Sequence, residues 1–261
     1  MPGDPILFVR AGALGDFVLT LPVLRALTMV GPVHVVTSQR YSVLFPPGAT
    51  LVSGEWLWRG AAPPVAYPVA VAFSAVTAEA LRAAGVREVL SVAPRPPPGV
   101  HAVDHYAGVL DGLVAVDRAP RVAAAPDPTV HGAPVVLAPG SGGAEKRWPF
   151  ERWRQVAGLL EAAGVPVVWV RGPDEAGEDW PVDARCPDLP GLAALAASCR
   201  AWIGPDAGPS HLAAAVGARV GVVFGVTDPA CWAPVGAQVW PWDVDAVTIA
   251  AWAGASGFTH R

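Results

Sequence analysis

Charged side chains are scarce in this chain, and those present carry no excess of positive charge. Only 15% of the 261 residues are Asp, Glu, Lys or Arg, and the formal net charge at pH 7 is −4. A protein that binds a nucleic-acid backbone usually presents a positive field to the phosphates. We therefore expect no nucleic-acid partner. Hydrophobic residues make up 52% of the chain, enough for the core of a folded α/β protein.

Cysteine pairs, a targeting segment and a long apolar run are also missing. The three cysteines, Cys186, Cys199 and Cys231, are odd in number and lack the spacing of metal ligands, which predicts buried, reduced thiols and no metal site. No basic segment precedes the first apolar residues, so we expect no secretory signal. Prolines interrupt the longest uncharged stretch, residues 60–78, and argue against a spanning helix. These absences favour a cytoplasmic protein.

Two widespread nucleotide-binding fingerprints are absent as well. The loop at residues 10–16 does not read Gly-x-Gly-x-x-Gly, which disfavours a nicotinamide or flavin enzyme. The glycine-rich loop at residues 139–149 has no Gly-Lys-Ser/Thr, which disfavours a P-loop nucleotide hydrolase. Neither class is expected.

The chain does contain an alternation of predicted strands and helices. Ile6–Val9 is a short apolar run typical of a strand buried on both faces, and the pattern at residues 16–27 predicts a helix. Such alternation is typical of parallel sheets with crossover helices, so we expect an α/β fold. Further strands are predicted at residues 33–37, 69–73, 86–92, 135–137, 165–170, 201–203 and 220–224, and further helices at 77–84, 101–116, 150–163, 210–216 and 244–253.

Proline clusters near residues 94–98 and 126–128 mark a change in organisation. Because the segment between the two clusters, residues 101–116, is predicted to be a helix, we interpret the second cluster as the linker. Each side of it contains a strand, a glycine-containing loop and a helix. The predicted domains are residues 1–130 and 131–245, followed by a C-terminal helix and tail at 246–261.

The loop at residues 10–16 directly follows the first predicted strand. Ligands of open parallel sheets bind beyond the carboxyl ends of the strands, where this loop lies. Arg10 opens the loop, and Gly12 and Gly15 permit close approach of the backbone to a ligand. Asp16 stands at the start of a helix, where aspartate often acts only as a cap. The sequence leaves open whether Asp16 caps the helix or takes part in chemistry.

The loop at residues 139–149 combines glycines with two cations. Gly140 and Ser141 lie near its start, and Lys146 and Arg147 come just before a predicted helix. Backbone N–H groups and the dipole of that helix would both favour an anion such as phosphate. A solvated basic turn is the alternative, so this loop is a candidate phosphate site.

Two more polar loops follow strands in the second half of the chain. Their candidate site residues are Asp206, Ala207, Gly208, His211 and Thr227. The proline after the glycine suits the first turn of a helix, whose free N–H groups would face an anion. A histidine in that turn could donate to a phosphate or merely pack there. Together, the four loops lie at strand ends of two domains, which predicts an interdomain cleft.

The order of these motifs resembles glycosyltransferase family nine, whose best-known members are the ADP-heptose:lipopolysaccharide heptosyltransferases. The resemblance rests on Leu14-Gly15-Asp16, His101-Ala-Val-Asp104-His-Tyr106, Lys146-Arg147-Trp148-Pro149, Asp206-x-Gly-x-x-His211 and Phe224-Gly-x-Thr227-x-Pro229. It implies a GT-B fold, with two Rossmann-like domains facing a central cleft. The short first domain would take the acceptor and the second the nucleotide sugar, with the segment at 246–261 returning to the first domain.

The resemblance also implies an inverting, metal-independent transfer of a heptose or similar sugar. The donor would be an ADP- or other NDP-sugar, the acceptor a glycan or glycolipid, and no cofactor would be needed. Asp16 would be the general base, and Lys146 would neutralise the diphosphate leaving group. Glu175 matches the position expected to bind the ribose hydroxyls, although Glu178 is close enough to compete for that role. The other implied donor-binding residues are Gly140, Ser141, Arg147, Asp206, Ala207, Gly208, His211 and Thr227, and the implied acceptor-side residues are Arg10, Gly12 and Gly15.

The chain departs from the family's pattern in length and at two positions. It is shorter than a usual member, mostly in the first domain, Ala207 stands where serine or threonine is common, and Val226 replaces a proline. The sequence therefore leaves open whether lipopolysaccharide is the acceptor. The resemblance is compatible with peripheral contact with the inner face of a membrane. A non-catalytic sugar-nucleotide-binding protein and a sugar-nucleotide epimerase stay as alternatives. The former would be indifferent to loss of Asp16, and the latter would need no acceptor.

Tryptophan is abundant, with 11 residues in the chain. Trp148, Trp153 and Trp169 lie near the predicted donor loops, where a ring could stack on a base or sugar. We expect them to pack in the core instead.

Overall fold

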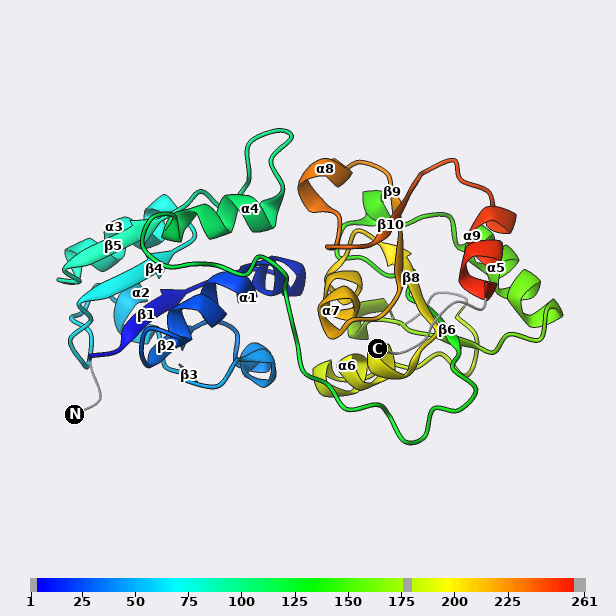
Figure 1. Ribbon diagram of the computed structural model, residues 1–261, viewed down its shortest axis with the longest axis horizontal. Helices are drawn as coiled ribbons and strands as arrows, with labels where there is room; N and C mark the ends of the chain where they lie inside the picture. The colour runs from blue at the N-terminus through cyan, green and yellow to red at the C-terminus, as the bar shows by residue number, and fades with distance from the viewer. Residues whose placement is uncertain (1–3, 176–179, 256–261) are drawn as a thin grey trace. The chain divides into compact units, whose positions relative to one another are not determined.

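The computed structural model describes residues 4–175 and 180–255 (Figure 1). Its contacts divide the chain into two compact units, Met1–Val122 and Ala123–Arg261. The division falls after Val122 and not at residue 130, because the predicted linker is bound to the second unit. There the Asp127 N–H donates to the Ser198 hydroxyl over 2.7 Å.

The first unit is built on a parallel sheet of five strands in the order β3-β2-β1-β4-β5. The central strand pairs Leu7 with His34 on one side and with Ala70 on the other. Both faces of this strand are covered, which explains its unbroken apolar sequence. The strands are β1 (Ile6–Val9), β2 (Val33–Val36), β3 (Ala49–Leu51), β4 (Val69–Ala72) and β5 (Glu88–Ser91).

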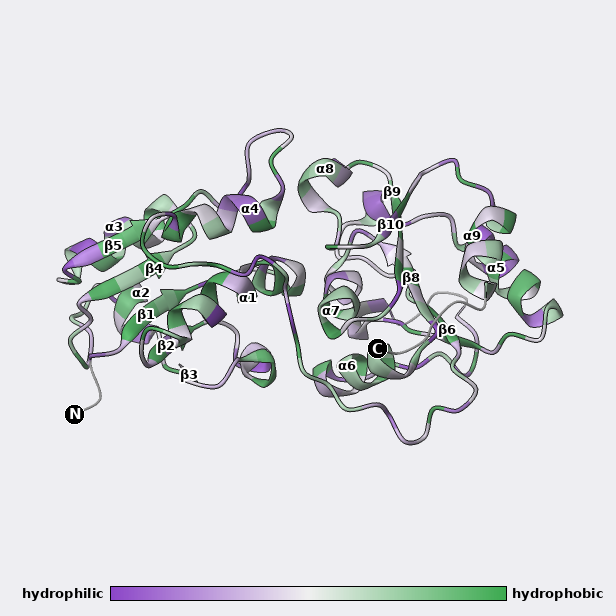
Figure 2. Ribbon diagram, viewed as in Figure 1, coloured by the Kyte–Doolittle hydropathy of each residue, from purple (hydrophilic) through white to green (hydrophobic). Residues whose placement is uncertain are grey.

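The helices of the first unit cover this sheet and place its loops. Helix α1 packs against α4, and α3 packs against β4 and β5. Ser74 caps α3 by accepting a hydrogen bond from the Thr77 N–H. Figure 2 shows the central strands in the green of hydrophobic residues. The helices are α1 (Leu14–Thr28), α2 (Glu55–Trp58), α3 (Ala75–Ala83) and α4 (Ala102–Ala107), with 3₁₀ turns η1 (Gln39–Leu44) and η2 (Gly108–Leu110).

The second unit has its own parallel sheet of five strands, in the order β10-β9-β8-β6-β7. Strand β8 is central and buried over its whole length. The strands are β6 (Val135–Leu137), β7 (Val167–Trp169), β8 (Ala201–Pro205), β9 (Val220–Phe224) and β10 (Gln238–Pro241). The helices are α5 (Phe150–Ala162), α6 (Leu189–Ser198), α7 (Gly208–Val216), α8 (Pro229–Trp232) and α9 (Ala246–Gly254), with 3₁₀ turns η3 (Ala144–Lys146) and η4 (Pro173–Glu175).

Tryptophans fill the core of the second unit, as the sequence predicts. Trp148, Trp153 and Trp169 are all buried in the cluster beneath α5 and α9. The Trp148 indole N–H donates to the Trp242 main-chain oxygen over 2.8 Å. These rings are committed to packing and to fixing loops.

The secondary structure differs from the expectations in two respects. The predicted helix at residues 101–116 ends at Ala107, and a 3₁₀ turn follows to Leu110, after which Gly112 takes a positive φ of 78°. The short elements β3, β10, α2 and α8 and the helix α6 were not predicted. The described part of the segment 246–261 is α9, which packs against α5 (Figure 1), and the return of this segment to the first unit stays a prediction.

Each sheet has a point at which successive connections run to opposite sides of the first strand. In the first unit this switch lies between β1 and β4, and in the second unit between β6 and β8. Ligands of open parallel sheets bind outside the carboxyl ends of the strands at such switch points. Among the described residues, no helix is long and apolar enough to cross a membrane.

Candidate functional site

Asp206 is the hub of a polar cluster at the switch point of the second unit. Asp206 directly follows β8, and Lys146 lies in the loop after β6. The Lys146 ammonium lies 2.8 Å from Asp206 Oδ2, and the Thr227 hydroxyl donates to the same oxygen over 2.8 Å. His211 Nε2 lies 3.2 Å from the other oxygen, Oδ1. Residues that follow two other strands, and one residue of a helix, therefore converge on this single carboxylate.

The surroundings of Asp206 keep it ionised. Burial would raise the pKa of Asp206, but hydrogen bonds and charge from His211 and Lys146 outweigh burial and hold this pKa at about 2. An ionised carboxylate only accepts hydrogen bonds, so His211 must carry its proton on Nε2. The carboxylate thus fixes both the Lys146 ammonium and the tautomer of His211.

Lys146 is the only lysine in the sequence. It ends the 3₁₀ turn η3, and its side chain is 27% exposed, so the ammonium remains open to solvent beside a buried anion. Every other basic side chain apart from histidine is arginine, whose guanidinium is a planar fork and not a compact charge.

The N-terminus of α7 lies beside this cluster. Its N-cap residue is Ala207, which has no side chain able to accept a hydrogen bond, and the helix then begins with Gly208. The first N–H groups of a helix have no partner within it and carry the positive end of the helix dipole. The Ser210 hydroxyl turns inward and donates to the Pro205 main-chain oxygen over 2.9 Å. Pro209 has no N–H, and the Ser210 N–H donates to the Ala207 main-chain oxygen over 3.0 Å, so the helix end offers an anion the Gly208 N–H and the positive end of its dipole.

Glu175 and Arg147 form a second group beside the loop after β6. Glu175 is 8% exposed, accepts a hydrogen bond from the Gly172 N–H over 2.7 Å and lies 3.8 Å from an Arg147 nitrogen. Arg147 also donates from Nε to the main-chain oxygen of Ser141 over 2.9 Å. Gly140 packs so closely on the Glu175 carboxylate that a Cβ atom there would overlap it. The predicted competitor Glu178 lies outside the described residues.

The first unit places its predicted residues at its own switch point. Arg10 follows β1, is 4% exposed and pairs through a terminal nitrogen with Asp16 Oδ1 at 3.2 Å. The same nitrogen donates to the Tyr106 hydroxyl oxygen over 3.3 Å. Asp16 also accepts a bond from the Ala13 N–H over 3.2 Å, which is a capping contact at the start of α1. Both open roles of Asp16 therefore remain compatible with its position.

The two glycines of this first loop do different things. Gly12 has a φ of +140°, and a Cβ there would lie 3.0 Å from Asp16 Oδ2, so this position needs glycine. Its main-chain oxygen accepts a bond from the Tyr41 hydroxyl over 3.2 Å. Gly15 is buried inside α1 and is no part of an open loop. The expected backbone approach is therefore available at Gly12 alone.

The structure joins most predicted residues into groups within each unit. One group is Lys146, Asp206, His211 and Thr227, a second is Gly140, Ser141, Arg147 and Glu175, and a third is Arg10, Gly12 and Asp16. The sequence assigned no role to Tyr106, Phe73 or Tyr41, which surround the third group. Phe73 immediately follows β4 at the switch point, and that placement is the signal that could have identified it.

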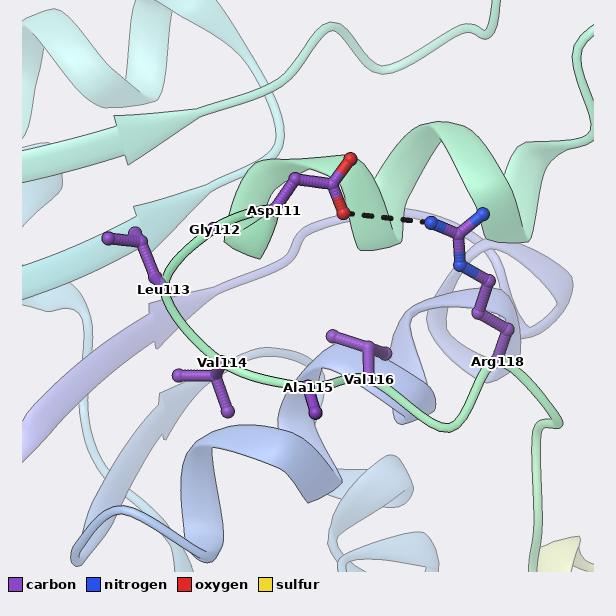
Figure 3. Close-up of a pocket in the computed structure, with 7 residues that line it drawn as sticks. All are labelled: Asp111, Gly112, Leu113, Val114, Ala115, Val116 and Arg118. Atoms are coloured by element: carbon purple, nitrogen blue, oxygen red, sulfur yellow. Dashed lines mark ion pairs between the residues drawn. The ribbon is translucent and has the colours of Figure 1, made fainter.

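An open hollow of about 360 Å³ lies elsewhere in the first unit (Figure 3). The segment from Asp111 to Val116 and Arg118 line it, and Arg118 reaches back to Asp111 at 3.6 Å. It contains none of the predicted site residues.

The cysteines lie outside these three groups of polar residues. All three cysteines are free, and burial raises the pKa of Cys199 to about 12, so that thiol is unreactive. Cys231 is buried as expected, but Cys186 is exposed, which corrects the prediction that all three lie inside. In the part of the chain that the structure describes, no three His, Cys, Asp or Glu side chains are grouped to hold a metal ion.

Solved structures similar to this one are glycosyltransferases. The glycosyltransferase family 9 protein from Veillonella parvula DSM 2008 has a TM-score of 0.73 at 18% identity, covering 92% of this chain and 86% of that one. The ADP-heptose lps heptosyltransferase II of E. coli has a TM-score of 0.72 at 17% identity, covering 95% of this chain and 97% of that one. The E. coli heptosyltransferase WaaC with ADP has a TM-score of 0.69 at 17% identity, covering 95% and 98%. These likenesses confirm the expected GT-B fold.

The sequence itself matches one family model. The model described as glycosyltransferase family 9 (heptosyltransferase) matches residues 101–243, which is more than half of the chain. No curated protein matches the sequence. The matched range includes the Lys146, Asp206 and Thr227 cluster and the α4 segment. The chain therefore belongs to glycosyltransferase family 9, and it is a glycosyltransferase.

Proposed function

We propose that this protein transfers a heptose or similar sugar from an ADP-sugar or other NDP-sugar to a hydroxyl of a glycan or glycolipid, with inversion and without a metal ion. The observation that carries the proposal is the ammonium of Lys146, held by Asp206 beside the bare N-terminus of α7. The charge of Lys146, the Gly208 N–H and the positive end of the α7 dipole together suit a diphosphate.

The donor site of this proposal lies in the second unit. The diphosphate would lie at the N-terminus of α7, beside the Gly208 N–H, with Lys146 as counter-charge. Glu175, buried beside Gly140, is the residue proposed to accept hydrogen bonds from the ribose hydroxyls. A related structure, E. coli heptosyltransferase WaaC, is solved with ADP and with ADP-2-deoxy-2-fluoro heptose. That likeness in fold supports an ADP-linked donor as the first to test.

The transfer step is a single displacement at the anomeric carbon. The acceptor oxygen forms the new bond to that carbon, and the bond from the carbon to the diphosphate oxygen breaks. The nucleoside diphosphate leaves with the electron pair, and the acceptor proton passes to the Asp16 carboxylate. Asp16 is 34% exposed, so a substrate hydroxyl can reach it. A positioned base of this kind contributes about 10²–10⁴-fold to the rate.

Leaving-group charge is the second requirement of the step. Many transferases neutralise a departing diphosphate with a divalent cation. Here Lys146 and the α7 dipole would take that role, with Arg147 close by in the same loop. Metal independence is therefore part of the proposal. The acceptor, including lipopolysaccharide, and contact with the inner face of a membrane belong to the proposal as well.

The presence of a single lysine allows a direct test of the donor site. An amine-directed reagent can modify only Lys146 and the N-terminal amine, and mass spectrometry of the peptides separates the two. We expect ADP at saturation to protect Lys146 and to leave the N-terminal amine reactive. The Lys146→Arg protein is the control, in which only the N-terminal label remains.

A panel of nucleoside diphosphates extends this test to the choice of nucleotide. The one that protects Lys146 at the lowest concentration identifies the donor's nucleotide. Protection by none of ADP, GDP, UDP and CDP would overturn the proposed donor site. A bound ligand at 100 times its dissociation constant also stabilises a protein by about 2.7 kcal/mol, so thermal melting provides an independent check.

A further inference from the structure

Arg10 is a charged side chain in an unusually enclosed place. Its side chain is only 5% exposed, and its Nε atom is buried without a hydrogen-bond partner. Removing a guanidinium from water is costly unless an anion and hydrogen bonds compensate it. The anion that the structure provides is Asp16. The chain thus maintains a buried cation beside the proposed base.

Two aromatic rings hold the guanidinium in place. Its central carbon lies 5.3 Å from the ring centre of Phe73 and 5.1 Å from that of Tyr106. The two rings meet edge to face, 5.6 Å apart at 88°. Phe73 follows β4 and Tyr106 lies on α4, so the cation is held by two other elements of the first unit. This confinement leaves Arg10 little freedom to move.

Tyr106 settles the direction of the hydrogen bonds. Burial raises the pKa of Tyr106, so its hydroxyl stays protonated at neutral pH. That hydroxyl donates to the main-chain oxygen of Pro94 over 2.7 Å, so its oxygen is available to accept from Arg10. The terminal nitrogen of Arg10 is fixed by Tyr106 on one side and faces Asp16 on the other.

The Asp16 carboxylate is held at both oxygens while staying accessible. Oδ1 faces Arg10 at 3.2 Å, and Oδ2 accepts from the Ala13 N–H over 3.2 Å. Capping of α1 requires only the bond to Ala13. A buried cation at the other oxygen adds nothing to the cap, but it fixes the rotation of the carboxylate about its own axis. Fixed orientation is what a general base requires.

We infer that Arg10 is a positioning residue for Asp16, clamped by Phe73 and Tyr106 at the switch point of the first sheet. The inference rests on the proposed function, in which Asp16 accepts the acceptor's proton. Arg10 itself stays protonated and exchanges no proton. Its unpartnered Nε is buried, so this atom is not a contact for an acceptor anion.

The test measures ADP release from ADP-heptose, with water in place of the acceptor hydroxyl, and ADP binding by calorimetry. For Arg10→Met we expect a kcat on the order of 10²-fold lower, with KM for ADP-heptose and the Kd for ADP unchanged, because misplacing a catalytic group by about 1 Å costs that much. Arg10→Lys should recover part of the rate, since it restores the charge but not the planar fork.

A double-mutant cycle separates positioning from a merely structural role. If Arg10 acts through Asp16, Arg10→Met causes no further loss of kcat in a protein that already carries Asp16→Asn. A structural role would instead lower kcat equally in both backgrounds and would lower the melting temperature. Arg25→Met is the matched control, because Arg25 also lies in the first unit and pairs with Asp117 at 3.2 Å. It should leave kcat unchanged.

The outcomes distinguish this inference from the proposed function. A wild-type protein that binds none of ADP, GDP, UDP and CDP overturns the proposed function and the role of Arg10 with it. If Arg10→Met keeps the wild-type kcat, only the role of Arg10 is overturned. The same holds if the losses in kcat from Arg10→Met and Asp16→Asn are additive in the double variant. If Arg10→Met does not fold, Arg10→Lys and Tyr106→Phe give the same comparison, and wild-type kcat in both overturns the inference.

Discussion

Gly140 shows how the absence of one methyl group shapes the proposed donor site. A Cβ at this position would overlap the carboxylate of Glu175, which is held by the Gly172 N–H. The carboxylate can therefore approach the β6 loop only because residue 140 is glycine. The sequence predicted a phosphate site in this glycine-rich loop, whereas the group that approaches Gly140 is a side chain of the protein.

Gly140→Ala should displace Glu175 and weaken donor binding. Overpacking of this kind typically costs about 1–3 kcal/mol, and we expect the Kd for ADP to rise about tenfold. Gly142→Ala is the control, because a Cβ there meets nothing within 4 Å. Calorimetric titration of both variants with ADP makes the comparison. Equal affinities would show that Glu175 does not contact the nucleotide.

Asp206 links the donor site to the stability of the second unit. Its pKa in the folded protein is about 2, compared with an ordinary value of 3.8. A lowered pKa stabilises the fold above the ordinary value, and this stabilisation is lost as pH falls towards the folded value. The difference corresponds to about 2 kcal/mol at neutral pH.

Asp206→Asn should therefore destabilise the second unit by about 2 kcal/mol at pH 7. The gap between wild type and variant should narrow as pH falls from about 4 to about 2, the range set by the two pKa values. Urea unfolding followed by tryptophan fluorescence measures it, since most tryptophans lie in this unit. If the difference in unfolding free energy stays constant down to pH 2, Asp206 is not held ionised by its neighbours.

The sequence predicts a residue's role where the residue belongs to a local motif. It does not where the role depends on contacts that only the fold creates. Lys146 and Asp206 were identified from their motifs, and the structure brings them together. Phe73 and Tyr106 were not assigned a role, because an aromatic residue near a strand end or on a short helix has no distinctive local pattern. Their contact with Arg10 depends on strand order, which no local pattern reveals.

At the scale of elements, α7 is notable for what its N-terminus lacks. Its N-cap residue, Ala207, has extended dihedral angles, with φ at −147° and ψ at 159°, and provides no side-chain hydrogen bond. Serine or aspartate at such a position normally stabilises a helix by about 0.5–2 kcal/mol. With no side chain at the N-cap, the space beside the Gly208 N–H stays open for a ligand.

Ala207→Ser and Ala207→Asp should both raise the melting temperature, since each supplies a cap. They should differ in ADP binding, because the aspartate places a negative charge where the diphosphate is proposed to lie. We expect Ala207→Asp to weaken ADP binding about tenfold or more and Ala207→Ser to preserve it. Stabilisation of both variants with undiminished ADP affinity would place the diphosphate elsewhere.

Elements with strong periodicity or buried apolar runs were predictable, and short ones were not. The strands at Ile6–Val9 and Val220–Phe224 are confirmed residue for residue. Strand β3 has only three residues and α8 only four, too few to show a period. The alanine-rich helix α6 has a weak polar face and follows a proline-containing segment, so its sequence gave little sign of a helix.

At the scale of the whole molecule, the two units share an architecture but not a topology. The first sheet runs β3-β2-β1-β4-β5, whereas the second runs β10-β9-β8-β6-β7. In the first unit the second and third strands, β2 and β3, lie on the same side of β1. In the second unit they lie on opposite sides of β6, with β7 on one side and β8 on the other. The sequence predicted two α/β units but could not give these orders, because strand order depends on the paths of the connections. Each strand order nevertheless places one ion pair at its switch point, Arg10 with Asp16 in the first unit and Lys146 with Asp206 in the second.

The central claim is a division of labour, with donor binding by the second unit and proton removal by the first. The measurement that tests it most directly is the Kd for ADP together with ADP release from ADP-heptose, for wild type, Asp16→Asn and Lys146→Ala. We predict that Asp16→Asn keeps the wild-type Kd and loses about 10²–10⁴-fold in turnover. Lys146→Ala should raise the Kd about 10- to 100-fold, the effect of losing a charge-assisted hydrogen bond. Unchanged ADP release in Asp16→Asn would contradict the account, whereas a wild-type protein that binds ADP but releases none from ADP-heptose would favour a binding protein or an epimerase.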